Sequence, residues 1–208
     1  MPLRNRVTPF GEIVALSGRG LIMGNRGVLH NDHRQIVRQW QVKRWIACRL
    51  AFRGRRRAVM RPHSYTELFF LDEATAFAAG HRPCAECRHE DYRRFRALWV
   101  SCHGGSGRAD EIDGRLHAER VLDRNTKRTY RATPSRLPDG AYVVLENCPW
   151  VVRGDRLFQW SDSAYAGWRP KLNVAEVDVL TPRSTVAVME SGYVPGFHPS
   201  VETAKRLP

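Results

Sequence analysis

Two cysteines stand three positions apart in the run "GHRPCAECRHE", residues 80–90. The thiolates of Cys84 and Cys87 can bind one metal ion between them, and a sulfur-rich site favours zinc. The alternative is a turn that contains two structural cysteines. A thioredoxin-like redox pair fits less well, because such a pair begins a helix after a strand, whereas this pair follows a predicted helix end. The spacing therefore predicts half of a zinc site.

A tetrahedral zinc site needs two further ligands from elsewhere in the chain. Cys48 is the first candidate, because it lies in a predicted strand just upstream of the pair. For the fourth ligand we rank His63 first, and three other histidines remain open: His81, His30 and His89. The predicted metal ligands are thus Cys48, His63, Cys84 and Cys87.

A second group of residues could perform acid–base chemistry. In "EIDGRLHAER" a helix would place Asp113 and His117 on one face, four positions apart, with Glu119 beside them. A histidine oriented by a carboxylate is prepared for general-base work or for metal ligation. Asp113, His117 and Glu119 are therefore the candidate catalytic residues. The alternative is a solvated helix with an ion pair between neighbouring turns.

Positive charge is concentrated in the first third of the chain. Residues 1–61 hold 14 basic and 2 acidic side chains, whereas residues 62–208 hold 20 and 19. Arginine makes up 30 of the 34 basic residues, and its planar fork suits phosphate. A GC-rich coding sequence would explain the arginines but not the scarcity of acids. The asymmetry predicts a polyanionic partner, DNA or RNA. We expect the contacts from six residues near Cys48: Lys43, Arg44, Arg53, Arg55, Arg56 and Arg57.

The order of the predicted elements is β, then α, then β, which indicates an α+β fold. Short apolar runs among glycines predict strands in the opening third, of which 44–52 is the strongest. Helices are expected from the N-cap Asp72 to the stop Gly80, and then over 88–100 and 109–122. Strands return after that, with a hairpin turn at 153–155.

The expected architecture is a small zinc-stabilised β-rich N-terminal part with two or three helices, followed by a β-rich C-terminal lobe. We place a basic, nucleic-acid-binding part over 1–100 and a β-rich lobe of unknown role over 111–208. The chain has no run of about 18 apolar residues and no secretory signal, so we expect a cytoplasmic protein without a membrane partner. Five cysteines, an odd number, argue against a disulfide framework.

The stretch "ELFFLDEATAFAAGHRPCAECR" resembles the second half of the zinc-binding domain of Ada-type DNA alkylation repair proteins. The resemblance covers about residues 40–90. The matching positions are Phe69, Phe70, Glu73, Ala74, Ala78, Ala79, Gly80, Arg82, Pro83, Cys84, Cys87 and Arg88. Upstream, "ACRLAF" is similar to the family's Cys-Arg-x-x-Cys, with Cys48 and Arg49 in the first two places. The resemblance implies a zinc site and DNA binding.

The chain departs from that family at Phe52, which stands where the family has its second upstream cysteine. A four-cysteine site is therefore impossible on this pattern, and a histidine substitutes or the metal keeps an open position. In the family the upstream zinc thiolate accepts a methyl group from a DNA phosphotriester, and Cys48 occupies the matching place. With one thiolate replaced, the site is less negative and its thiolates should be less nucleophilic.

Three functions follow from these observations. The first is a zinc-containing DNA-binding protein in DNA repair or modification. The second is a DNA- or RNA-acting hydrolase, such as a nuclease, a glycosylase or a base-modifying enzyme, that uses Asp113, His117 and Glu119. The third is a metal-dependent regulatory protein that binds a protein partner. Turnover on labelled oligonucleotides separates the first from the second. Salt dependence separates the second from the third, because phosphate binding releases counterions.

Overall fold

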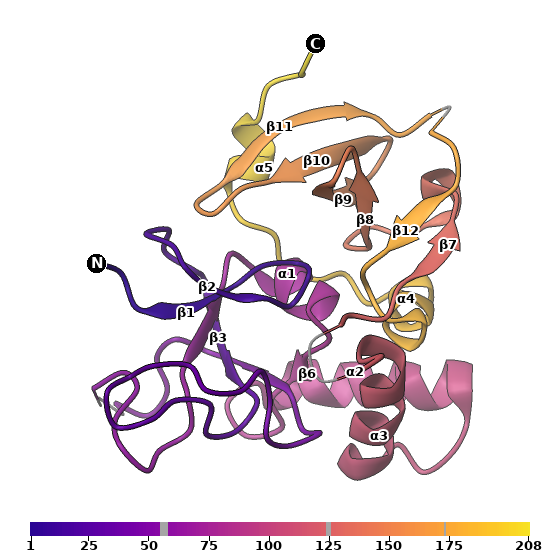
Figure 1. Ribbon diagram of the computed structural model, residues 1–208. Helices are drawn as coiled ribbons and strands as arrows, with labels where there is room; N and C mark the ends of the chain where they lie inside the picture. The colour runs from indigo at the N-terminus through magenta and orange to yellow at the C-terminus, as the bar shows by residue number, and fades with distance from the viewer. Residues whose placement is uncertain (55–57, 124–125, 173) are drawn as a thin grey trace.

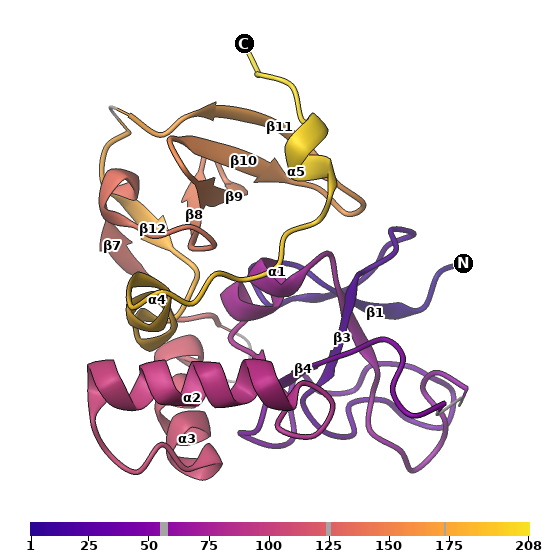
Figure 2. The same cartoon turned by 180° about the vertical axis from the view of Figure 1, so that it is seen from behind.

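The chain folds into two β-sheets with helices packed between and beside them, so the predicted α+β class is confirmed (Figure 1). The computed structural model describes residues 1–54, 58–123, 126–172 and 174–208. The first sheet comes from the N-terminal part and the second from the C-terminal part, and α2 and α3 lie at one side of the first sheet (Figure 2).

The first sheet is mixed, with the strand order β2-β1-β5-β3-β4-β6. Most neighbours are antiparallel, but β1 runs parallel to β5 and β4 runs parallel to β6. Its strands are short: β1 Arg4–Val7, β2 Ile13–Ala15, β3 Ile22–Asn25, β4 Ile46–Cys48, β5 Leu68–Phe70 and β6 Arg82–Pro83. The strand expected over 44–52 is thus only three residues long. Beyond Cys48 the chain leaves the sheet.

The second sheet is antiparallel, with the order β11-β10-β9-β8-β12-β7. Its strands are β7 Tyr130–Ala132, β8 Tyr142–Leu145, β9 Cys148–Arg153, β10 Arg156–Trp160, β11 Tyr165–Pro170 and β12 Val177–Val179. The hairpin turn predicted at 153–155 is present, with Gly154 at a φ of +58°. The aromatic residues crowded into this region are mostly buried core: Tyr142, Trp150, Phe158 and Tyr165.

Five α-helices and one short 3-10 helix complete the described chain: α1 Glu73–Ala78, α2 His89–His103, α3 Ala109–Arg120, η1 Pro134–Arg136, α4 Arg183–Glu190 and α5 Ser200–Thr203. The predicted helices in the middle are therefore confirmed. Hydrophobic clusters join the two parts of the chain. Leu71 of the first part packs in one cluster with Tyr142 and Val151, and Phe77 packs in another with Val188. The predicted boundary between 100 and 111 is crossed by this shared core.

Candidate metal centre

Helix α1 brings the chain to the Cys-x-x-Cys turn by a well-defined start and stop. Asp72 accepts a hydrogen bond from the backbone N–H of Thr75 at 2.8 Å, which caps the first turn. At the other end Gly80 has a φ of +92° and its N–H donates to Phe77, while His81 N–H donates to Ala76, both at 2.9 Å. This is the Schellman pattern, which a glycine completes without steric cost. The chain therefore reverses directly into β6.

The parallel register of β4 and β6 then places the upstream cysteine beside the pair. Ala47 is opposite Pro83, and the N–H of Cys84 donates to the carbonyl of Ala47 at 2.9 Å. Cys48, one residue further along β4, thus comes next to Cys84. Two segments about 36 residues apart in the sequence meet here only because β6 joins the edge of the sheet.

Three thiol groups converge at this point. The sulfur atoms of Cys48, Cys84 and Cys87 all lie within 4.8 Å of one another, and all three residues are buried or nearly so. The backbone N–H of Arg49 donates to the sulfur of Cys87 at 3.4 Å. This is the arrangement that a soft, thiolate-binding cation requires. The prediction that Cys48 joins Cys84 and Cys87 is borne out in its geometry.

The pKa values of the three thiol groups are shifted in different directions. A hydrogen bond between Cys48 and Cys84, together with burial, raises the pKa of the Cys48 thiol far above its ordinary value. The same hydrogen bond from Cys48, with backbone donors at Cys87 and Glu86, lowers the pKa of Cys84 to about 5. Burial raises the pKa of Cys87. A bound cation would replace the protons of these thiol groups, because thiolates are the ligands of a metal ion.

The structure does not bring His63 into this group. His63 is exposed, with a φ of +57°. None of the other candidate histidines belongs to the group either. His30 bonds Thr66 and the carbonyl of Arg61, His81 is buried, with its Nε2 3.4 Å from Nε of Arg26, and His89 is exposed at the start of α2.

A cavity of about 370 Å³ opens onto the three cysteines, and its lining includes the carboxylate of Glu67. Oε2 of Glu67 accepts from the backbone N–H of Met60 at 2.8 Å, whereas Oε1 is buried without a hydrogen-bond partner. A buried carboxylate oxygen without a donor is costly unless a cation or water satisfies it. Sequence reasoning missed Glu67, although a single acid inside the apolar run "TELFF" is an available signal.

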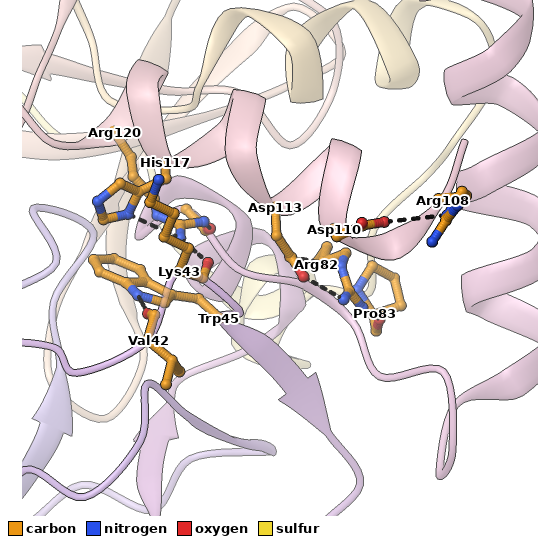
Figure 3. A network of polar contacts seen from close by, with 11 residues as sticks. Val42, Lys43, Trp45, Arg82, Pro83, Arg108, Asp110, Asp113, His117 and Arg120 are labelled. Atoms are coloured by element: carbon orange, nitrogen blue, oxygen red, sulfur yellow. Dashed lines mark hydrogen bonds and ion pairs between the residues drawn. The ribbon is translucent and has the colours of Figure 1, made fainter. Parts of the chain in front are cut away.

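The three candidate catalytic residues lie on α3 but face different partners. Asp113 accepts two hydrogen bonds from Arg82, at 2.9 and 2.7 Å, in a buried ion pair (Figure 3). Glu119 accepts from the N–H and the hydroxyl of Ser184, at 2.8 and 2.6 Å. His117 packs edge-on against Trp40, with ring centroids 4.6 Å apart. Two of the three thus hold α3 to its neighbours, and the expected carboxylate–histidine pair is not formed.

The imidazole of His117 is kept neutral by its surroundings. Burial, with the positive charges of Arg120 and Lys43, lowers its pKa to about 4. Nδ1 of His117 lies 3.4 Å from a guanidinium nitrogen of Arg120, which is a donor and not a carboxylate (Figure 3). A histidine in this setting can accept a proton only weakly, so the geometry does not favour a general base here.

Three of the six predicted nucleic-acid contacts are exposed: Lys43, Arg44 and Arg53. Lys43 and Arg44 precede β4, and Arg53 follows it, with its guanidinium 5.0 Å from the ring of Phe52. The exposed basic side chains therefore flank the strand that carries Cys48. Arg55, Arg56 and Arg57 lie outside the described residues.

Comparisons with family models, with curated proteins and with solved structures find no match to this chain. Among the helices of the described residues, none is long and apolar enough to cross a membrane.

Proposed function

We propose that this protein binds one zinc ion through Cys48, Cys84 and Cys87, and that the part so stabilised binds DNA. The convergence of the three sulfur atoms within 4.8 Å carries the proposal. Thiolates so close repel one another, and a divalent cation that replaces their protons removes the repulsion. Sulfur ligands in a compact group favour zinc over the hard cations magnesium and calcium.

The cavity beside the three cysteines is also lined by Glu67. The unpartnered Oε1 of Glu67 supports a cation or a zinc-bound water nearby, because either would satisfy it. Because Glu67 lies outside the group of ligand atoms within 4.8 Å, we assign it, rather than His63, as a residue that supports a zinc-bound water and not as a ligand. Around zinc sites, an acidic residue commonly hydrogen-bonds the bound water or one of the ligands.

DNA binding is supported by the charge distribution and by the resemblance to Ada-type zinc domains. The net charge of +12 over residues 1–61 has few acids to cancel it. Lys43, Arg44 and Arg53 are exposed on the two sides of β4, where a phosphate backbone can reach them. Zinc in this account holds β4 and the Cys-x-x-Cys turn together, and so fixes the surface on which these residues stand.

Metal analysis of the purified protein tests the zinc part. We expect about one zinc per chain in the parent, and Cys84→Ser should lose it. Cys102→Ser is the matched control, because Cys102 is exposed on α2 and outside the thiol group, and it should keep the metal. If the parent protein is folded and stable but takes up no zinc from zinc-containing buffer, the proposal is overturned.

Fluorescence anisotropy with a labelled DNA duplex, at several salt concentrations, tests the DNA part. Lys43→Gln with Arg44→Gln should weaken binding for all sequences alike and reduce the slope of log K against log salt by up to about 2. Arg136→Gln, at an exposed position in the C-terminal part, is the control and should leave the slope unchanged. An equal slope for the parent and the double variant would show that Lys43 and Arg44 do not contact the DNA phosphates.

A further inference from the structure

Another cavity, also of about 370 Å³, lies between the first sheet and the C-terminal end of α3. Besides the exposed Arg4, its lining contains three cationic side chains from separate segments: Arg26 just after β3, Arg120 at the end of α3, and Lys127 in the bridge that follows. Arg26 and Arg120 are only 1% and 2% exposed. Cations buried to this degree ordinarily have an anionic partner.

These cations keep donors that the protein does not use. Arg26 donates through Nη1 to the carbonyl of Gly11 at 2.9 Å, but its Nη2 is buried without a partner. Arg120 donates through both terminal nitrogens to backbone carbonyls, but its Nε is buried without a partner. Lys127 donates one hydrogen to the carbonyl of Ala78 at 2.6 Å, and an ammonium group has three. The acceptors of these cations are neutral: backbone carbonyls and the imidazole nitrogens of His81 and His117.

No ion pair joins any of the three cations to a carboxylate within the described part of the chain. Asp113 lies within electrostatic reach of Arg120, but its two oxygens are both bonded to Arg82. The acids of the lining, Glu12 and Asp123, are exposed at the rim.

The cations are therefore held close to one another at a cost. Burial, with the charges of Arg26 and Arg120, lowers the pKa of Lys127 to about 7, and burial lowers that of Arg26 to about 9. The indole of Trp45 compensates in part, since the guanidinium carbon of Arg120 lies 3.9 Å from its ring centroid (Figure 3). The guanidinium carbon of Arg26 lies 4.0 Å from the same ring. Cation–π contacts are weaker than the desolvation that they offset.

We propose that this cavity binds the phosphate group of a nucleotide-sized ligand, with Arg26, Arg120 and Lys127 as its partners. A phosphate in the cavity supplies the missing negative charge beside the two guanidinium groups, and it can accept from the ammonium group of the half-buried Lys127. Trp40, which is half-buried in the same lining, offers an aromatic surface for the base of a nucleotide. A volume of about 370 Å³ is within the range of small-ligand pockets and larger than one phosphate needs.

The phosphate can come from a free mononucleotide or from the 5′ end of a DNA strand. The inference stands on residues outside the zinc site and does not depend on zinc or on DNA binding by Lys43 and Arg44. Its failure would leave the proposed function untouched, and the reverse also holds.

Isothermal titration of the full chain, at constant ionic strength, is the test. The probes are inorganic phosphate, dAMP, deoxyadenosine, and one oligonucleotide with either a 5′-phosphate or a 5′-hydroxyl. We expect dAMP to bind more tightly than phosphate, and deoxyadenosine not to bind. Preference for the 5′-phosphorylated over the 5′-hydroxyl oligonucleotide would assign the strand end, and equal affinity for the two with saturable binding of dAMP would assign the free nucleotide. No saturable binding of any phosphorylated probe would overturn the proposal.

Two variants separate a ligand site from a structural cluster. Lys127→Met and Arg26→Gln should each weaken the binding of dAMP by roughly tenfold or more, the loss typical of one charge-assisted hydrogen bond. Lys127→Met should also match or exceed the parent in melting temperature without ligand, because it removes a half-buried charge that has no carboxylate partner within the described part of the chain. Lys205→Met, at an exposed position, is the control. Unchanged dAMP affinity in both variants, or a loss equal to that of the control, would refute the assignment.

Discussion

Asp113→Asn is the change that best distinguishes a structural role for Asp113 from a catalytic one. Asp113 and Arg82 form a two-point ion pair with side chains 6% and 2% exposed, and it joins α3 to β6. Asparagine keeps the shape but leaves the guanidinium of Arg82 buried without a counter-charge. Breaking one side of a buried pair costs about 3–5 kcal/mol in the free energy of unfolding.

That loss is large for a domain of this size, whose total stability is on the order of 5–15 kcal/mol. At about 2–4 °C per kcal/mol, it corresponds to a fall of roughly 6–20 °C in melting temperature. Urea unfolding followed by tryptophan fluorescence would measure it, with an unchanged m-value as the sign that the folded state is otherwise intact.

Asp110→Asn is a control on the same helix. Its ion pair with Arg108 has side chains 76% and 75% exposed, with the atoms 3.6 Å apart, so the variant should lose less than about 1 kcal/mol. If Asp113→Asn is as stable as Asp110→Asn, the buried pair does not hold α3 in place. The carboxylate would then be free for another role, and the structural interpretation of Asp113 would be refuted.

Three further outcomes follow from particular contacts. Gly80→Ala should destabilise the fold, because φ is +92° and an added Cβ would lie 2.4 Å from the side chain of Arg120. Gly114→Ala, in the open middle of α3, should stabilise the fold by about 0.5–1 kcal/mol. Thermal unfolding of both variants compares them. Folded His117 has a pKa of about 4 against 6.5 in the unfolded chain, so the unfolded state binds more protons and stability falls as the pH drops from 6.5 to 4. His117→Gln should remove that part of the fall in urea unfolding measured across this range, and equal pH profiles would contradict the assignment. Glu67→Gln should lower zinc affinity roughly 10–100-fold in chelator competition while the fold persists, and unchanged affinity would exclude Glu67 from the site.

The local signals in the sequence were sufficient for the turn that carries the cysteine pair. Asp72, Gly80 and the Cys-x-x-Cys define a capped helix, a left-handed stop and a pair of ligands by rules that act over a few residues. The nomination of Cys48 also agreed with the structure, since the two segments that form the site are joined by strands of the same sheet. The α+β class followed from the order of the apolar patterns in the same way.

What the sequence could not show depends on long-range packing. The spacing of Asp113 and His117 was consistent with an acid–base pair, but Arg82 from β6 takes the carboxylate and the tryptophans take the imidazole. Likewise His63, ranked first among the four candidate histidines, is exposed, while Glu67, the residue before β5, lines the cavity. Partners of this kind are decided by which elements become neighbours, and no local pattern reports that.

The sulfur coordination of the bound metal is the most direct test of the proposed three-thiol zinc site. X-ray absorption at the zinc edge of the purified full chain would count the ligands and measure their distances. The three-thiol site predicts about one zinc per chain, with three sulfur ligands at about 2.3 Å and one oxygen or nitrogen ligand at about 2.0–2.2 Å. A zinc ion bound without sulfur, or a folded chain that binds no zinc at all, would contradict the three-thiol zinc site.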